Sequence, residues 1–356
     1  MFMKHRRSAW LAVCSSLAIA ASAAGAQPTL ASTPDDTSSG LPDLSGASLV
    51  IYSGRNEEFV QPFVDRFVSA TGADVEVRYG NSAEMGAALM EEGDNTPADV
   101  FYSQEASAVG PLARAELLAP LPDDVVELVD ERYRPAEGNL WVGVTGRSRV
   151  IVYNPNLVTE VPTTTADLTD PQYEGEVAFV PGNASFQTFV TAFRVTAGED
   201  AARQWLEDMI ANGAITTYES NGDVLAAVNA GEVPIGLINH YYWAQLLDEV
   251  GPEGMAAELV FPDGDDPGAL VMATAVAITA HGADNPAALA FVEYMLTPEG
   301  QSYFAGETFE YPLVEGVPGP EGVPPLDDLE GPALDQTDLD SIEATQQLLT
   351  EVGLLS

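Results

Sequence analysis

The chain has 356 residues, with 13 basic and 55 acidic side chains and a net charge of −42. A surface this acidic repels nucleic acids and anionic membranes, so neither is expected as a partner. The acids are spread along the chain and are not gathered in one tail. Such a spread is typical of a solvated acidic coat, as in proteins that stay soluble in high salt, while attraction of cations is the functional alternative.

Residues 1–26 have the three-part pattern of a secretory signal. Lys4, Arg6 and Arg7 form a basic start, and small residues precede Gln27. The apolar stretch between them is too short and too often interrupted by serine for a membrane span, and no later segment is apolar for long enough. We therefore expect export to the periplasm or cell envelope and a mature chain without a membrane span. Without the signal, 10 basic side chains face 55 acidic ones, a net charge of −45.

The only cysteine, Cys14, lies inside this signal. The mature chain is therefore expected to have no disulfide and no thiolate metal site. Residues 11–14 faintly resemble a lipidation motif, but Val13 is too large for the position before the cleavage point, so lipidation is the minor alternative. Roughly 330 residues remain, enough for two domains with sizeable cores.

The first half of the mature chain alternates strand and helix patterns. Residues 27–46 are rich in Pro, Ser, Thr and Asp and predict a flexible leader. Phe59, Phe63 and Phe67 recur at helical spacing between two apolar runs. The expected elements are a strand at 48–52, a helix from about 59 to 71, a strand at 75–77, a helix at 85–90 and a strand at 97–102. This order predicts an α/β fold with a mostly parallel sheet.

A second series begins after two apolar runs at 141–144 and 149–153. The long apolar strand at 270–279 could carry the chain back to the first domain. The remaining expected elements are strands at 177–180, 214–218 and 234–238, helices at 186–195, 200–210, 224–229, 286–296 and 339–352, and a Pro- and Gly-rich loop at 312–332.

Tyr241 and Tyr242 follow the strand at 234–238, where a helix begins. Strand-to-helix junctions are where α/β proteins bind ligands. Two phenols at this point are either packing residues or two hard oxygen donors for one highly charged cation. A free phenol has a pKa of about 10; ferric iron can deprotonate it at neutral pH, as in tyrosinate-bound haem iron. On spacing alone, packing is the simpler interpretation.

Five stretches, in order, resemble periplasmic ferric-iron-binding proteins, the solute-binding components of iron ABC transporters. They are residues 50–55, 91–102, 146–150, 231–243 and 266–271. The resemblance implies a two-lobed periplasmic-binding-protein fold of type II, with mixed sheets and crossover hinge strands. It implies a first lobe from residues 47–147 and 271–322, and a second lobe from residues 148–270 and 323–356.

The same resemblance implies that Tyr241 and Tyr242 bind Fe(III) and that a monomeric protein delivers it to an inner-membrane ABC permease. The dipole of the following helix would favour the phenolate forms. No catalysis is expected, because the chain lacks esterase, zinc-protease and cysteine-nucleophile motifs. His240, beside the pair, is not expected to be a ligand, because a neutral imidazole suits softer metals.

Two positions depart from the family pattern. Many members have a histidine after the glycine that ends the first strand, and a glutamate after the third strand, where this chain has Asn56 and Gln104. The site then resembles the subgroup that completes coordination with carbonate, a small carboxylate or water. Arg55 matches an arginine that pairs with this synergistic anion, and its planar fork suits an oxyanion. A surface arginine at a helix start is the alternative.

Other family positions suggest weaker candidates. The residues that match anion-binding positions are Asn183, Ser185, Asn221 and Asn239, and the asparagines at 221 and 239 could instead cap helices. Candidates for the cleft from the first lobe are Tyr52, Tyr79 and Tyr102. Phe179 stands near a third tyrosine ligand of some members, so that ligand is not expected here.

The same fold could instead bind a polyamine, a sulfate-like oxyanion or an organic acid. Trp243 would then serve as a stacking wall for the ligand.

Overall fold

The computed structural model describes residues 40–332, 334–339 and 342–355. The expected signal and the leader up to residue 39 lie outside the described residues. Residues 40–46, also expected in the leader, belong to the packed part: Leu44 is buried and its N–H donates to the carbonyl of Thr71. Within the described part, no helix combines the length and the apolar character that a membrane span requires.

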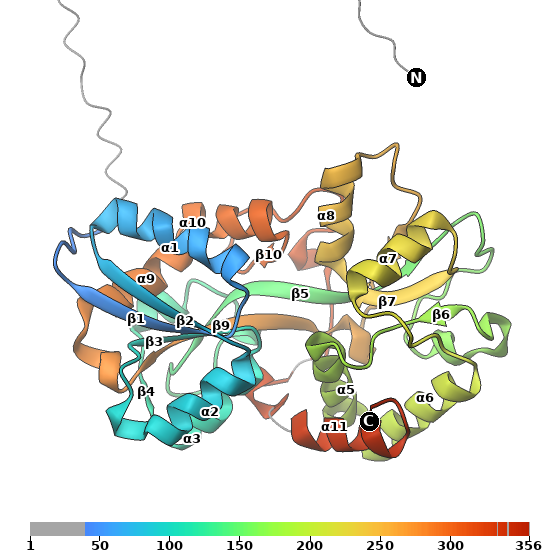
Figure 1. Cartoon of the computed structure of the whole chain (residues 1–356), viewed down its shortest axis with the longest axis horizontal. Helices are drawn as coiled ribbons and strands as arrows, with labels where there is room; N and C mark the ends of the chain where they lie inside the picture. The colour runs from blue at the N-terminus through green and yellow to red at the C-terminus, as the bar shows by residue number, and fades with distance from the viewer. Residues whose placement is uncertain (1–39, 333, 340–341, 356) are drawn as a thin grey trace, which may run out of the picture. The chain divides into compact units, whose positions relative to one another are not determined.

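The strands form one mixed sheet in the order β2-β1-β3-β9-β5-β7-β6, with β4 paired to β9, and β8 and β10 paired to β5 (Figure 1). β1 pairs in parallel with β2 and β3, while β9 and β5 run antiparallel to their neighbours. The bounds are β1 Ser48–Ser53, β2 Asp74–Tyr79, β3 Val100–Ser103, β4 Leu118–Ala119, β5 Val142–Tyr153, β6 Val177–Ala178, β7 Ile235–Asn239, β8 Glu258–Val260, β9 Val271–Thr279 and β10 Tyr311–Pro312.

β5 crosses between the two groups of strands (Figure 1). It pairs with β9 from Val142 to Ser148 and with β7 from Arg149 to Tyr153. The sequence predicts two apolar runs here, and the structure joins them into one strand of 12 residues. Gly146 allows a close crossing, because a Cβ there would lie 2.8 Å from Cγ1 of Val271.

The longer helices lie where helical spacing predicts them, and their ends are encoded in the sequence. α1 ends at Gly72, whose φ of 73° is the left-handed conformation that glycine adopts without strain. α2 starts with a reciprocal cap between Asn81 and Glu84. The α-helices are α1 Glu57–Thr71, α2 Ser82–Glu92, α3 Gly110–Arg114, α4 Asp123–Val126, α5 Ala184–Ala197, α6 Glu199–Ala211, α7 Asn221–Ala230, α8 His240–Val250, α9 Pro286–Met295, α10 Pro298–Tyr303 and α11 Ile342–Glu351.

Apolar side chains gather in separate clusters on either side of the crossing strands. The largest packs α1, α9 and α10 against β1 and β3, around Phe63 and Phe291. Another packs α5 and α6 against β6 and β7, around Phe186 and Trp205. α11 adds Leu348 and Leu349 to the second of these clusters.

One expected strand is absent from the described structure. Residues 214–218 make only a single bridge, between Ile215 and Ala178. Pairing ends there because the chain then turns toward Ser220, which caps α7. The helices α3, α4 and α10 were not expected, since four to six residues are too short to display a helical period.

Candidate functional site

Tyr241 and Tyr242 lie in the first turn of α8, directly after β7. Both side chains are half-buried, and their ring centroids are 4.5 Å apart at an interplanar angle of 31°. Burial, followed by the neighbouring phenol of Tyr241, raises the pKa of Tyr242 above its ordinary value of 10.0. A partner that keeps this phenol ionised at neutral pH must therefore offset a desolvation cost.

Arg149 is a buried cation beside this pair. It lies on β5 opposite Asn239, and its Nη1 donates to Oδ1 of Asn239 at 3.1 Å. The amide of Asn239 in turn donates to the hydroxyl of Tyr241 at 3.3 Å. Arg149 is 1% exposed, and its Nε and Nη2 have no hydrogen-bond partner in the described structure.

No carboxylate compensates Arg149 within the described residues. Burial lowers its pKa to about 10, although the phenols of Tyr241 and Tyr242 act in the opposite direction. A buried, unpaired charge is costly, so this arrangement favours a ligand that brings negative charge to the arginine.

Arg55 has a different environment from the one expected. Its two terminal nitrogens donate to both carboxylate oxygens of Glu310, at 2.9 and 3.1 Å, and both residues are buried. The guanidinium holds the pKa of Glu310 below its ordinary range, against the effect of burial. The fork predicted to hold an anion is thus occupied by a carboxylate of the chain itself, and Arg55 is not a surface arginine either.

Arg147 connects the two sides of the site. From its position on β5, it donates to Oγ of Ser185 at 3.2 Å and to the carbonyl of Gln104. The Arg147 guanidinium is also 3.6 Å from Glu105 and 3.9 Å from Glu310. Burial raises the pKa of Glu105, with Arg147 opposing this rise. Ser185 belongs to α5, and Gln104 follows β3, so one side chain joins these two elements.

The four predicted anion-binding residues of the second lobe differ in how they are used. Asn183 caps α5, with its Oδ1 accepting from the N–H of Phe186 at 3.1 Å. Asn239 joins Arg149 to Tyr241 and makes no cap hydrogen bond. Asn221 is not the cap of α7 either, because Ser220 has that role. Its amide is 1% exposed, and neither amide atom has a partner in the described structure.

The predicted first-lobe candidates do not form a set of oxygen ligands. Asn56 is exposed before α1, and Gln104 contacts Arg147 only through its backbone. The hydroxyl of Tyr52 donates to Glu92 and accepts a hydrogen bond from Arg78. Glu92 is the last residue of α2, at the opposite end of that helix from Ser82. The hydroxyl of Tyr79 donates to Gln61 at 2.8 Å.

Tyr102 lies closer to the site. It is buried, and the Arg55 guanidinium stands 5.5 Å from its ring centroid. Burial raises the pKa of Tyr102 to about 12, with Arg55 opposing the rise. It is therefore neutral without a ligand.

Three further aromatic residues have structural contacts. His240 is fully buried, accepts the N–H of Ser148 at its Nδ1 and stacks on Tyr311 at 4.5 Å. Phe179 stacks on Phe186 at 4.7 Å. The Trp243 indole donates to the carbonyl of Ala257 at 2.7 Å.

Sequence reasoning did not assign roles to Arg147, Arg149, Glu105 and Glu310. A signal existed for the arginines, because residues two apart on a strand share a face. Their complete burial was not visible in the sequence. In the described part of the chain, no three His, Cys, Asp or Glu side chains come together in a possible metal cluster. Among the described residues, the hydrogen-bond donors beside the phenols are mainly arginine and amide groups.

The fold is that of a two-lobed solute-binding protein. The chain belongs to the bacterial extracellular solute-binding protein family, whose sequence profile matches residues 95–328. The Fe(3+)-binding periplasmic protein of Serratia marcescens is 35% identical over 310 residues, covering 86% of this chain and 90% of that protein. The resemblance found in the sequence is thereby confirmed.

Solved structures give the same result for the fold. Iron-bound HitA from Pseudomonas aeruginosa has a TM-score of 0.78 and 33% identity, covering 86% of this chain and 100% of that one. A Trichodesmium protein (IdiA, FutA) in complex with iron and citrate ligands has a TM-score of 0.73 and 26% identity, covering 86% and 99%. The predicted type II periplasmic-binding-protein fold is confirmed.

Proposed function

We propose that this protein binds Fe(III) outside the cytoplasm, through Tyr241 and Tyr242, together with an anion beside Arg149. It then delivers the iron to a membrane ABC permease without catalysing a reaction. The carrying observation is the placement of two adjacent phenols beside a buried arginine that has no carboxylate partner. The names of the similar proteins support iron as the cargo.

The charges favour iron with an anion over iron alone. Two phenolates leave one positive charge on Fe³⁺, and the buried arginines outnumber the buried glutamates around it. A second anionic species would lower this excess charge. Asn221, whose buried amide lacks a partner, and Ser185 are available as hydrogen-bond donors to it. Carbonate and small carboxylates fit this description, and a citrate-bound relative supports the second class.

We also propose the lobe boundaries expected from the sequence, 47–147 with 271–322 and 148–270 with 323–356. The separation of the apolar clusters supports this division in its main part, while Leu329 lies in the first-lobe cluster and Val323 and Leu326 pack against it. On this division the phenols belong to the second lobe and Arg55 to the first. Ligand capture would then close the lobes by its greater affinity for the closed form.

An iron-free oxyanion or organic acid is the second candidate. Arg149 and Asn221 favour an anionic ligand as such, with or without a metal. The same arginines disfavour a polyamine, because like charges would be brought together in a buried site.

The test uses the chain without its signal and compares two variants. Tyr241→Phe with Tyr242→Phe removes both phenol oxygens, while Tyr52→Phe removes a hydroxyl already bound to Glu92. We expect the wild type and Tyr52→Phe to bind Fe(III) with bicarbonate and to show a red-to-orange tyrosinate charge-transfer band. The double variant should lose the band and at least about 1,000-fold in affinity, or about 4 kcal/mol.

Circular dichroism would establish that the double variant is folded. Unchanged iron affinity and absorption in this variant would refute the assignment of the phenols. Tight binding of citrate in the absence of iron, combined with no binding of citrate in the presence of iron, would favour the second candidate.

A further inference from the structure

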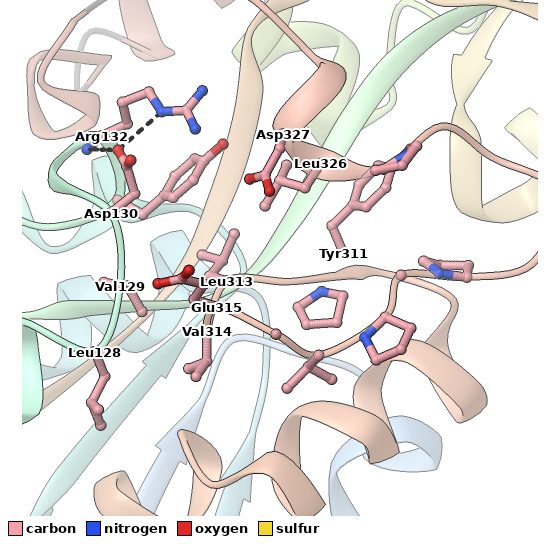
Figure 2. Close-up of a pocket in the computed structure, with 18 of the residues that line it drawn as sticks. Leu128, Val129, Asp130, Arg132, Tyr311, Leu313, Val314, Glu315, Leu326 and Asp327 are labelled. Atoms are coloured by element: carbon pink, nitrogen blue, oxygen red, sulfur yellow. Dashed lines mark hydrogen bonds and ion pairs between the residues drawn. The ribbon is translucent and has the colours of Figure 1, made fainter.

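A pocket of about 750 Å³ lies apart from the phenols, between the segment 127–133 and the segment 311–327 (Figure 2). Its volume is within the range of roughly 300–1,000 Å³ that is usual for small-molecule sites. Its apolar lining comes from leucine, valine and tyrosine side chains, among them Leu128, Leu313 and Leu326, and from five prolines. The prolines restrict the backbone of this wall, so part of the ordering cost of binding is already met.

Charge in this pocket has one dominant sign. Four exposed carboxylates line it, from Glu127, Asp130, Glu315 and Asp327. The only basic lining residue is Arg132, which is paired with Asp130 at 3.0 Å. Figure 2 shows this pair at one end and Asp327 and Glu315 along the pocket. An anion would be repelled here, while an organic cation would be attracted.

Tyr311 supplies an independent observation that points to a ligand. Its side chain lines the pocket and is fully buried, and its hydroxyl has no hydrogen-bond partner in the described structure. Leaving a buried hydroxyl unpaired costs about 1–3 kcal/mol. A ligand with an N–H donor would satisfy the oxygen of Tyr311 and remove this cost.

We propose that this pocket is a second binding site, which takes a small organic ammonium ion with an apolar body. The ammonium group pairs with the rim carboxylates and the Tyr311 hydroxyl, while the body packs among the prolines and aliphatic side chains. A metal ion is not the occupant, because the described acids do not gather into a metal cluster. Its lining does not include Tyr241 or Tyr242, although Tyr311 stacks on His240, which directly precedes them.

Three probes with one body and different charges test the site: benzylammonium, benzyl alcohol and benzoate. Calorimetric titration should give benzylammonium at least about tenfold tighter binding than benzyl alcohol, with no detectable binding of benzoate. Asp327→Asn should weaken benzylammonium binding about three- to tenfold. Tyr311→Phe should also weaken it, while keeping the ring that stacks on His240.

The control must account for the charge of the whole chain, which attracts cations everywhere. Glu207→Gln removes one charge from the exposed face of α6, away from the pocket lining, and should leave benzylammonium affinity unchanged. Equal affinities for the three probes would overturn the proposal. So would equal weakening by Glu207→Gln and Asp327→Asn, or amide shifts induced by benzylammonium only outside residues 127–133 and 311–327.

Discussion

Arg55 and Arg149 are both buried beside the tyrosine pair, and their environments are opposite. Arg55 is 4% exposed and has a bidentate carboxylate partner, Glu310. Arg149 is 1% exposed, and within the described residues its side chain hydrogen-bonds only to the amide of Asn239, while its guanidinium lies 5.6 Å from the Phe186 ring centroid. A guanidinium neutralised by its own chain contributes to the fold. A buried guanidinium without a counter-charge is costly unless a ligand supplies that charge. We therefore expect the anion at Arg149.

Breaking the compensated pair should have the largest effect. Arg55→Ala leaves the carboxylate of Glu310 buried without its bidentate partner, with Arg147 remaining 3.9 Å away, and we expect the free energy of unfolding to fall by about 3–5 kcal/mol. Urea denaturation of the ligand-free protein measures this loss. Arg55→Met combined with Glu310→Met should recover much of it, because a buried ion pair can be replaced by apolar groups. A loss below about 1 kcal/mol for Arg55→Ala would place the pair outside the structural core.

Acid should remove the contributions of His240 and Glu310 to stability over different ranges of pH. Burial lowers the pKa of His240 from 6.5 to about 4, so its contribution to stability is complete above pH 6.5 and is lost as the pH falls to 4. Glu310, whose pKa is below 4.5, contributes fully above pH 4.5 and loses its contribution only at lower pH. At 1.36 kcal/mol per pKa unit, the loss due to His240 is about 3 kcal/mol.

The measurement is the stability of the ligand-free protein at several pH values, for the wild type and for His240→Asn. Between pH 7 and 4 the wild type should lose about 3 kcal/mol more than the variant. Parallel curves would mean that His240 is protonated as readily in the folded as in the unfolded chain.

Substituting Arg149 should have the smallest effect, and it tests whether Arg149 serves the ligand while Arg55 serves the fold. Arg149→Met removes an uncompensated charge, so the ligand-free protein should be at least as stable as the wild type. On the proposed function, Fe(III) affinity in bicarbonate should fall about 10- to 100-fold, or about 1.4–2.8 kcal/mol. Arg149→Lys, which keeps the charge and loses the fork, should lie between. Destabilisation as large as that of Arg55→Ala would make Arg149 a structural residue.

The sequence predicted most of the fold because the signals were local. The phenylalanines of α1, the glycine that ends it and the apolar run of β9 each act within a few residues. Whether the residues of β5 form one strand or two was harder to predict, because two apolar runs do not reveal whether the chain turns between them. The strand expected at 214–218 was wrong for a similar reason: propensity cannot tell whether a neighbouring strand is there to pair with.

The candidate site was predicted in part. The tyrosine pair was singled out because both residues are adjacent, follow a strand and match the paired tyrosines of the family, and its role as an iron site stays a prediction. Arg55 was matched to an anion because its partner, Glu310, is 255 residues away in the chain. No pattern in the residues near Arg55 indicates this partner. The sequence likewise did not show that the hydroxyl of Tyr52 donates to Glu92, 40 residues away. Arg149 was visible in the sequence, but its lack of a counter-charge exists only in three dimensions.

The position of α11 has a consequence for the order of folding. Leu348 and Leu349 are buried in the same cluster as Ile151 and Trp205, and Thr345 shares a hydrogen bond with Thr191 of α5. That core stays incomplete until residue 349 has emerged from the ribosome. A nascent chain with one apolar face still open remains pliable during nearly all of its synthesis. This pliability would suit passage through a secretion channel, the route that the expected signal at residues 1–26 predicts.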